Sequence, residues 1–146
     1  GMMQKDNRMI AFVCTGNTCR SPMAEAIFND MAEKNGVCVR AESFGIATST
    51  GLPVSENSVI ACKEIGIDLS GKASTAVADA GIEKYEKFYC MSQSHAKMLM
   101  QFFLVQPEKI AVLGISDPYG GDIDVYRHCR DEIVNSVKEI LKAYEN

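Results

Sequence analysis

Short apolar runs alternate with amphipathic stretches along most of this chain of 146 residues. The run Met9–Val13 is apolar throughout, as is typical of a strand buried on both faces, and apolar residues at helical spacing follow it. Further strands are predicted at 37–43, 87–91 and 109–113, each followed by a predicted helix, the first of these at 53–65. This order predicts a single-domain, three-layer α/β sandwich over residues 1–146, with helices on both faces of a four-stranded parallel sheet.

The composition is that of an ordinary globular domain, with 47% hydrophobic and 23% charged residues. A net charge of −4 argues against nucleic acid or an anionic membrane as partner, because either would favour a basic surface. No apolar stretch approaches transmembrane length, and the N-terminus lacks the pattern of a signal peptide, so a cytoplasmic location is expected. Gly1 before Met2 is interpreted as a tag remnant.

Six cysteines in a short chain can indicate a disulfide framework, but a chain of this length can form an adequate core without cross-links. Cys38, Cys62 and Cys90 lie in apolar segments, and we expect them to be buried thiols. Cys14 and Cys19 differ from these, because they lie in a turn-forming segment between a predicted strand and a predicted helix.

That segment reads Cys14-Thr15-Gly16-Asn17-Thr18-Cys19-Arg20-Ser21-Pro22. Backbone N–H groups of such a turn converge on an anion, and the N-terminus of the following helix adds positive potential. Gly16 and Asn17 tolerate the left-handed backbone angles of a tight loop, and Arg20 can grip two phosphate oxygens. The segment therefore predicts a binding loop for phosphate or another oxyanion.

The same positive field favours the thiolate of Cys14, which would then be placed for in-line attack on phosphorus. Ser21 and Pro22 fit the N-cap and first turn of the helix. Ser21 could also donate a hydrogen bond to the sulfur, and both roles are open. A bare cysteine-x5-arginine match is weak, but its setting between a strand, a glycine loop and a helix makes it specific.

The run from Phe12 to Ala26 resembles the signature of the low-molecular-weight protein tyrosine phosphatases. Ser43, two residues before Gly45, resembles the family serine that braces the loop asparagine, here Asn17, and Lys72 stands where many members carry histidine. The resemblance implies sheet order 2-1-3-4 and a hydrolase that forms a phosphocysteine intermediate on Cys14. It also implies that phosphate is bound by Arg20 and by the loop residues Thr15, Gly16, Asn17, Thr18, Cys19 and Ser21.

Asp117-Pro118-Tyr119-Gly120-Gly121-Asp122 follows the fourth predicted strand and resembles the Asp-Pro motif of the family. The resemblance implies that Asp117 protonates the leaving group and then acts as base for the hydrolytic water. Without the phosphate loop, the simpler interpretation is an aspartate that begins a proline turn. Tyr119 is expected at the rim of the pocket, and Asp122 and Asp124 are expected to begin the last helix.

Related phosphatases carry a second cysteine at the position of Cys19, which suggests a reversible Cys14–Cys19 disulfide that protects the nucleophile. His95 and His128 fit no catalytic pattern and are expected to be surface or structural residues. The sequence has no metal-ligand spacing, and neither a metal nor another cofactor is expected.

Two positions bear on the substrate, which we expect to be a phosphorylated protein. Tyrosine-selective members usually carry larger aliphatic residues where this chain has Thr15 and Thr18. Thr18, with the Gly-Gly of the acid loop, resembles the protein arginine phosphatase branch, and its hydroxyl makes the pocket more polar. Phosphotyrosine and phosphoarginine both remain candidates, with phosphoarginine favoured.

Two other functions would use the same loop. A thioredoxin-coupled arsenate reductase shares the phosphate-type loop but needs two further cysteines near the end of the third strand, and residues 91–106 contain none. A phosphate-binding module without catalysis would not need Cys14, Arg20 and Asp117 together. The sequence therefore predicts a cysteine-dependent protein phosphatase, which we expect to be a monomer.

Overall fold

The computed structural model describes residues 8–145 and contains a four-stranded parallel sheet in the order β2-β1-β3-β4. This confirms the predicted α/β class and the strand order 2-1-3-4. The strands are β1 (Arg8–Cys14), β2 (Val39–Gly45), β3 (Lys87–Cys90) and β4 (Ile110–Val112). The helices are α1 (Arg20–Lys34), α2 (Glu56–Lys63), α3 (Val77–Ala80), α4 (Gln93–Phe102) and α5 (Ile123–Lys142), with short 3-10 turns at Ile82–Lys84 and Pro107–Lys109.

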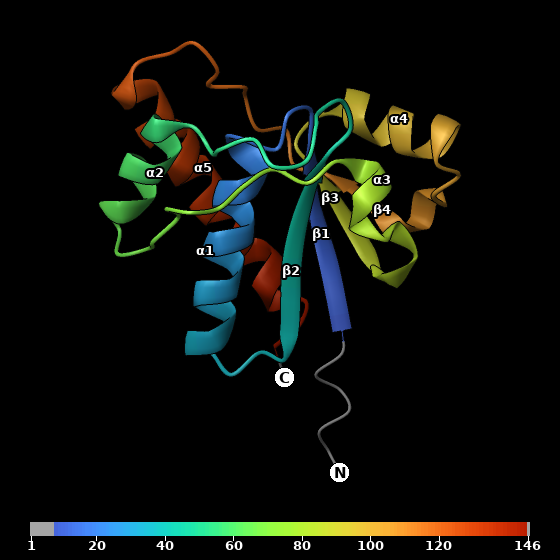
Figure 1. The fold of residues 1–146 in the computed structure, drawn as a ribbon. Coiled ribbons are helices and arrows are strands. Elements are labelled where there is room, and N and C mark those ends of the chain that lie inside the picture. Colours follow the sequence, from blue (N-terminus) through green and yellow to red (C-terminus); the bar gives the residue numbers. More distant parts are fainter. Residues whose placement is uncertain (1–7, 146) are drawn as a thin grey trace.

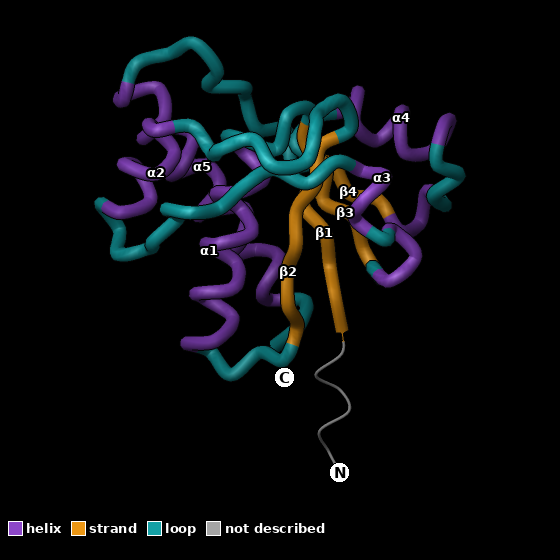
Figure 2. Tube along the Cα trace, in the orientation of Figure 1, coloured by secondary structure: helices purple, strands orange, loops and turns teal. Residues whose placement is uncertain are grey.

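The helices cover both faces of the sheet. Helices α1, α2 and α5 pack together on one face, and α3 and α4 lie on the other (Figure 1). The loops that follow the strands gather beyond their carboxyl ends (Figure 2). Ligands of open α/β sheets bind at this edge, so the topology alone points to where a site would form.

The central strand β1 explains how the nucleophile candidate is positioned. Its residues from Ile10 to Cys14 are at most 3% exposed, because β2 and β3 pair with it on either side. Side chains alternate along a strand, so Ile10 and Phe12 pack with the α1 and α5 layer while Ala11 and Val13 pack with α4. Full burial of a side chain such as Phe12 contributes about 1.5–3 kcal/mol, which anchors the strand that ends at Cys14.

Several predicted boundaries were wrong by a few residues. Helix α1 begins at Arg20, because the Met23 N–H already bonds the Cys19 carbonyl, so Ser21 lies inside the helix and is not its N-cap. Strand β2 begins at Val39, later than predicted, because the Val37 N–H still bonds back to the Ala32 carbonyl at the end of α1. Helix α2 spans Glu56–Lys63 and not 53–65, since the Ser55 side chain caps its start.

The expectation for the cysteines was correct at two positions and wrong at one. Cys62 and Cys90 are fully buried, and burial raises the pKa of each thiol to about 12. Cys38 is exposed, because it lies in the turn before β2 and outside the sheet. Asp122 caps α5 through a hydrogen bond from the Val125 N–H, and Asp124 lies in its first turn, as predicted. No helix within residues 8–145 is long and apolar enough to cross a membrane.

Candidate active site

The segment after β1 forms a small pocket at the carboxyl edge of the sheet. The pocket has a volume of about 140 Å³ and is lined by Cys14–Arg20 together with Asp117 and Tyr119. Two segments that lie about a hundred residues apart in the sequence therefore meet at one point, because β1 and β4 run parallel in the same sheet. A larger hollow of about 730 Å³ lies beside Arg8, at the opposite end of β1.

Cys14 lies at the floor of this pocket with its side chain held by two neighbours. The Asn17 N–H donates to the sulfur at 3.2 Å, and the Ser21 hydroxyl lies 2.8 Å from it. The N-terminus of α1 begins at Arg20, so the positive end of the helix dipole is close to the same sulfur. Cys14 is 3% exposed, so the protein shields its sulfur from most of the bulk water.

The direction of the Ser21 hydrogen bond follows from its neighbours. The Thr75 N–H donates to Asn17 Oδ1 at 2.8 Å, which fixes the orientation of the amide. Asn17 Nδ2 then donates to Ser21 Oγ at 2.7 Å and to Ser43 Oγ at 3.0 Å. Since Ser21 Oγ already accepts from Asn17, its own hydrogen is free to be donated to the Cys14 sulfur.

The backbone of the loop meets the sequence expectation at Asn17 and departs from it at Gly16. Asn17 has a φ of +56°, in the left-handed region that asparagine tolerates, and it is fully buried. Gly16 does not have a positive φ. The glycine that the loop requires is Gly45 at the end of β2, because a Cβ there would lie 2.7 Å from the Thr15 carbonyl oxygen.

The hydrogen bonds continue from Ser43 to two residues to which sequence reasoning gave no site role. Ser43 donates to Glu25 Oε1 at 2.6 Å, and Lys72 Nζ pairs with the same oxygen at 3.0 Å. The predicted brace between Ser43 and the loop asparagine is thus part of a longer chain that ends in an ion pair. The sequence carried one indication of a site role for Glu25. It lies four residues after Ser21 on α1 and therefore on the same face of the helix.

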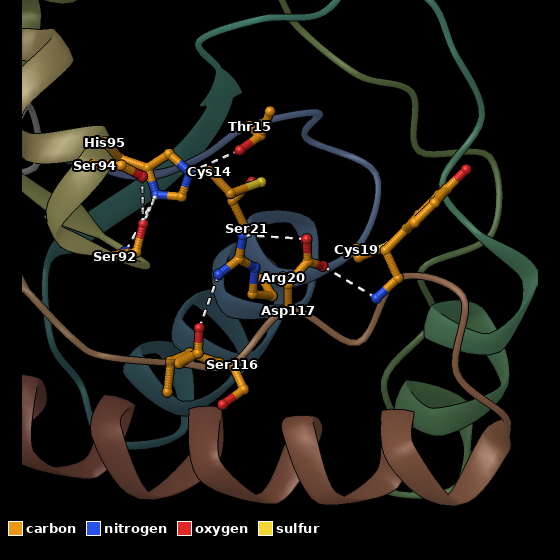
Figure 3. Close-up of polar contacts among 12 residues, drawn as sticks. Cys14, Thr15, Cys19, Arg20, Ser21, Ser92, Ser94, His95, Ser116 and Asp117 are labelled. Carbon is orange, nitrogen blue, oxygen red and sulfur yellow. Dashed lines mark hydrogen bonds and ion pairs between the residues drawn. The ribbon is translucent and has the colours of Figure 1, made fainter.

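Arg20 links α1 to the loop after β4. Its guanidinium donates to the Ile115 carbonyl at 2.8 Å and lies 3.8 Å from Asp117 Oδ2 (Figure 3). Arg20 is 6% exposed, whereas the Asp117 side chain is about half-exposed. Asp117 Oδ1 accepts the Tyr119 N–H at 3.1 Å, and the Tyr119 side chain is exposed at the rim.

Cys19 is a buried residue of the loop, and its sulfur faces the start of α2 and helix α5. Its Sγ lies 3.4 Å from the Tyr126 hydroxyl and 3.6 Å from Ser55 Oγ. Burial, together with the hydrogen bond to Cys19, raises the pKa of Tyr126 to about 12. Thr18 is half-buried at the pocket wall.

His95 was expected at the surface or in a structural role, and the surface interpretation was wrong. Its side chain is 3% exposed and lies between Ser92 and Thr15 (Figure 3). Burial and the nearby charge of Arg20 lower its pKa to about 4. The sequence could have indicated a structural role for His95, because Ser92-x-x-His95 has the spacing of a helix capping box. His128 is exposed and faces Glu132 at 3.8 Å.

Within the part of the chain that the structure describes, no group of three or more His, Cys, Asp or Glu side chains could hold a metal ion. The pocket instead combines a buried sulfur, a guanidinium and a carboxylate around a loop at a helix N-terminus. Such a set can bind an oxyanion and attack its central atom.

Comparisons with known proteins agree with this chemistry. Residues 9–146 match the family model of the low molecular weight phosphotyrosine protein phosphatases. The chain is 33% identical over 142 residues to a protein-arginine-phosphatase of Bacillus subtilis, which covers 91% of this chain and 94% of the relative.

Two solved structures are similar over nearly the whole chain. One is a cysteine-to-serine mutant of the YwlE arginine phosphatase with a phosphorylated active-site serine, at 32% identity and a TM-score of 0.87, covering 92% of this chain and 94% of that one. The other is a low molecular weight protein tyrosine phosphatase from T. tengcongensis, at 31% identity and a TM-score of 0.88, covering 93% and 99%. The chain therefore belongs to the low molecular weight phosphotyrosine protein phosphatase family.

Proposed function

We propose that this protein is a cysteine-dependent protein phosphatase that works through a phosphocysteine on Cys14. The observation that carries the proposal is the pocket itself, in which the Cys14 sulfur, the Arg20 guanidinium and the Asp117 carboxyl line one space of about 140 Å³. The phosphorylated serine of the related YwlE mutant supports the covalent route, because it lies at the active-site position of that protein.

In the first step, the loop amides and Arg20 hold the phosphoryl group, and the Cys14 thiolate attacks phosphorus from the side opposite the leaving group. A sulfur–phosphorus bond forms, and the bond from phosphorus to the side-chain oxygen or nitrogen breaks. Asp117 lies at the mouth of the pocket and donates its proton to the departing atom. General acid catalysis of this kind contributes typically about 10²- to 10⁴-fold.

In the second step, a water molecule attacks phosphorus and the Cys14 thiolate leaves. Asp117, now a carboxylate, takes the proton of this water, and inorganic phosphate is released. The hydrogen bonds from Ser21 and from the Asn17 amide stabilise the sulfur as its negative charge returns.

For the substrate we propose phosphoarginine on proteins. Thr15 and Thr18 give two walls of the pocket a hydroxyl each, and the Asp117 carboxyl group can accept a hydrogen bond from a guanidinium through its carbonyl oxygen while it still carries its proton. The protein-arginine-phosphatases of Bacillus subtilis and Geobacillus stearothermophilus are among the relatives, at 33% and 34% identity. Tyrosine phosphatases occur among the relatives too, so phosphotyrosine is the competing substrate.

We also propose that the enzyme acts in the cytoplasm as a monomer, without nucleic acid or membrane as partner. The net charge of −4 supports the absence of nucleic acid and anionic membrane as partners, because it gives little attraction to polyanions. Arsenate reduction is not favoured. The third strand ends at Cys90, whose fully buried thiol has a raised pKa, and no further cysteine follows before residue 107.

Oxidation of Cys14 and Cys19 to a disulfide is proposed as a protective device. The two thiols would lose two electrons to peroxide, and Cys19 would have to leave Tyr126 and Ser55 to reach Cys14. Peroxide-treated protein should then regain activity on addition of a thiol reductant, and a Cys19→Ser variant should not. Equal recovery of the two proteins would exclude the device.

The test of the proposed function is kcat/KM on a matched pair of peptides that differ in carrying phosphoarginine or phosphotyrosine. Cys14→Ala is the blank, chosen over serine because the serine of the related mutant is itself phosphorylated. Preference for phosphoarginine, reduced by Thr18→Ile, supports the arginine assignment, and preference for phosphotyrosine contradicts it. Absence of any turnover that depends on Cys14 would leave a phosphate-binding module.

A further inference from the structure

His95 does not line the pocket described above and lies on a different element from every residue that does. It is the third residue of α4, whereas the loop follows β1 and the acid follows β4. Its ring is 3% exposed, and Nε2 lies 2.9 Å from Thr15 Oγ1 (Figure 3). Both ring nitrogens of this buried imidazole have hydrogen-bond partners, and one of these partners belongs to the loop that carries Cys14.

The tautomer of the ring follows from its second nitrogen. The Ser92 N–H donates to His95 Nδ1 at 3.2 Å, so Nδ1 is an acceptor and carries no hydrogen. Burial and the neighbouring Arg20 keep the ring neutral at pH 7, so its single hydrogen lies on Nε2. His95 is therefore the donor and Thr15 Oγ1 the acceptor in the contact between them.

This hydrogen bond acts on a wall of the pocket. Thr15 lines the pocket directly after Cys14 and is otherwise exposed, so little else restricts its side-chain rotamer. Its carbonyl is already held by the Ala47 N–H at 3.0 Å, on the side of β2. The hydrogen bond from His95, on α4, restricts the Thr15 side chain. The Ala47 and His95 contacts together therefore hold both the backbone and the side chain of Thr15.

We propose that His95 is a positioning residue, which donates a hydrogen bond to Thr15 and so sets the shape of the pocket wall that meets the leaving-group side of the substrate. The inference rests on the proposed phosphatase function. Because Thr15 lies at the open side of the pocket, the contact matters for the part of the substrate beyond the phosphate. Loss of the contact should therefore raise KM for a phosphopeptide and leave the affinity for inorganic phosphate nearly unchanged.

Three variants separate the contact from general damage. Thr15→Val keeps the shape of the side chain and removes the acceptor, and His95→Leu removes the donor. His95→Gln keeps an amide donor towards Thr15 and an acceptor for the Ser92 N–H, since glutamine suits this position of a capping box. Thr15→Val and His95→Leu should each raise KM about three- to tenfold, as expected for one hydrogen bond, and the double variant should be no worse than the poorer single variant. His95→Gln should recover most of the loss.

The experiment measures kcat and KM for the better of the two matched peptides, the inhibition constant of inorganic phosphate, and the ¹⁵N shifts of the His95 ring. Additive effects in the double variant, or a phosphate constant that changes as much as KM, would overturn the proposal. If His95→Leu does not fold, an unchanged KM in Thr15→Val is enough to overturn the proposal.

The ¹⁵N shifts of the His95 ring do not depend on turnover and should show the Nε2–H tautomer. An inactive wild type would refute the phosphatase function, whereas an active wild type with a ring protonated on Nδ1 would refute this inference alone.

Discussion

Replacement of Ser21 by alanine should slow the second chemical step more than the first. The Ser21 hydroxyl lies 2.8 Å from the Cys14 sulfur, and its hydrogen is directed there because Asn17 Nδ2 donates to the same oxygen. A hydrogen bond to a charged group contributes about 1.5–3 kcal/mol. This bond is worth most when the thiolate is the leaving group, so hydrolysis of the phosphocysteine should slow roughly 10- to 100-fold.

Rapid mixing with p-nitrophenyl phosphate measures both steps at once. In Ser21→Ala we expect a burst of p-nitrophenolate of about one equivalent per enzyme, followed by a slow steady state, because the phosphocysteine accumulates. Ser43→Ala is the matched control. It removes the other acceptor of Asn17 Nδ2 and leaves the Ser21 hydroxyl on the sulfur, so its steady state should fall less. A Ser21→Ala protein with the steady-state rate and burst of the wild type would refute the direction assigned to this bond.

Asp117→Asn should lower kcat roughly 10²- to 10⁴-fold on a phosphotyrosine peptide and less on p-nitrophenyl phosphate, whose leaving group scarcely needs a proton; equal losses would argue against the acid role. Burial lowers the pKa of His95 from 6.5 to about 4, so the neutral ring stabilises the fold above pH 6.5, and this contribution is lost as the pH falls from 6.5 to about 4. Urea unfolding of His95→Gln should show a shallower loss of stability across that window, and a loss as steep as in the wild type would contradict the assignment. Phe28→Ala, at a fully buried position, should lower the free energy of unfolding by about 3–5 kcal/mol in the same assay, and a loss below about 1 kcal/mol would contradict the packing of α1 described above.

The sequence alone predicted the fold class and the residues of the loop, and the reason is physical. A strand that is apolar at every position is typical of the inside of a parallel sheet, and this indicates the direction of the chain at Cys14. Parallel strands end at one edge, which places the loop after the fourth strand at the same edge of the sheet as the loop after the first. Asn17 was recognisable because few residue types other than glycine accept a left-handed backbone angle.

Contacts between distant residues could not be predicted in this way. The Thr15–His95 bond joins residues 80 positions apart, and its existence depends on how α4 is set against β3. The ion pair of Lys72 with Glu25 depends on the path of an irregular segment for which no local pattern exists. The start of α1 was placed too late because Cys19 has no side-chain cap, so the residue before the helix carries no capping signal.

The proposed function requires the phosphoryl group to pass through the sulfur of Cys14. The most direct measurement is rapid acid quenching of the wild type during turnover of a phosphopeptide, followed by mass spectrometry of the digested protein. We expect one phosphoryl group on the fragment that contains Cys14, in larger amount in Ser21→Ala and absent from Cys14→Ala. A phosphoryl group on another residue, or full turnover by Cys14→Ala, would exclude a phosphocysteine on Cys14 as the intermediate.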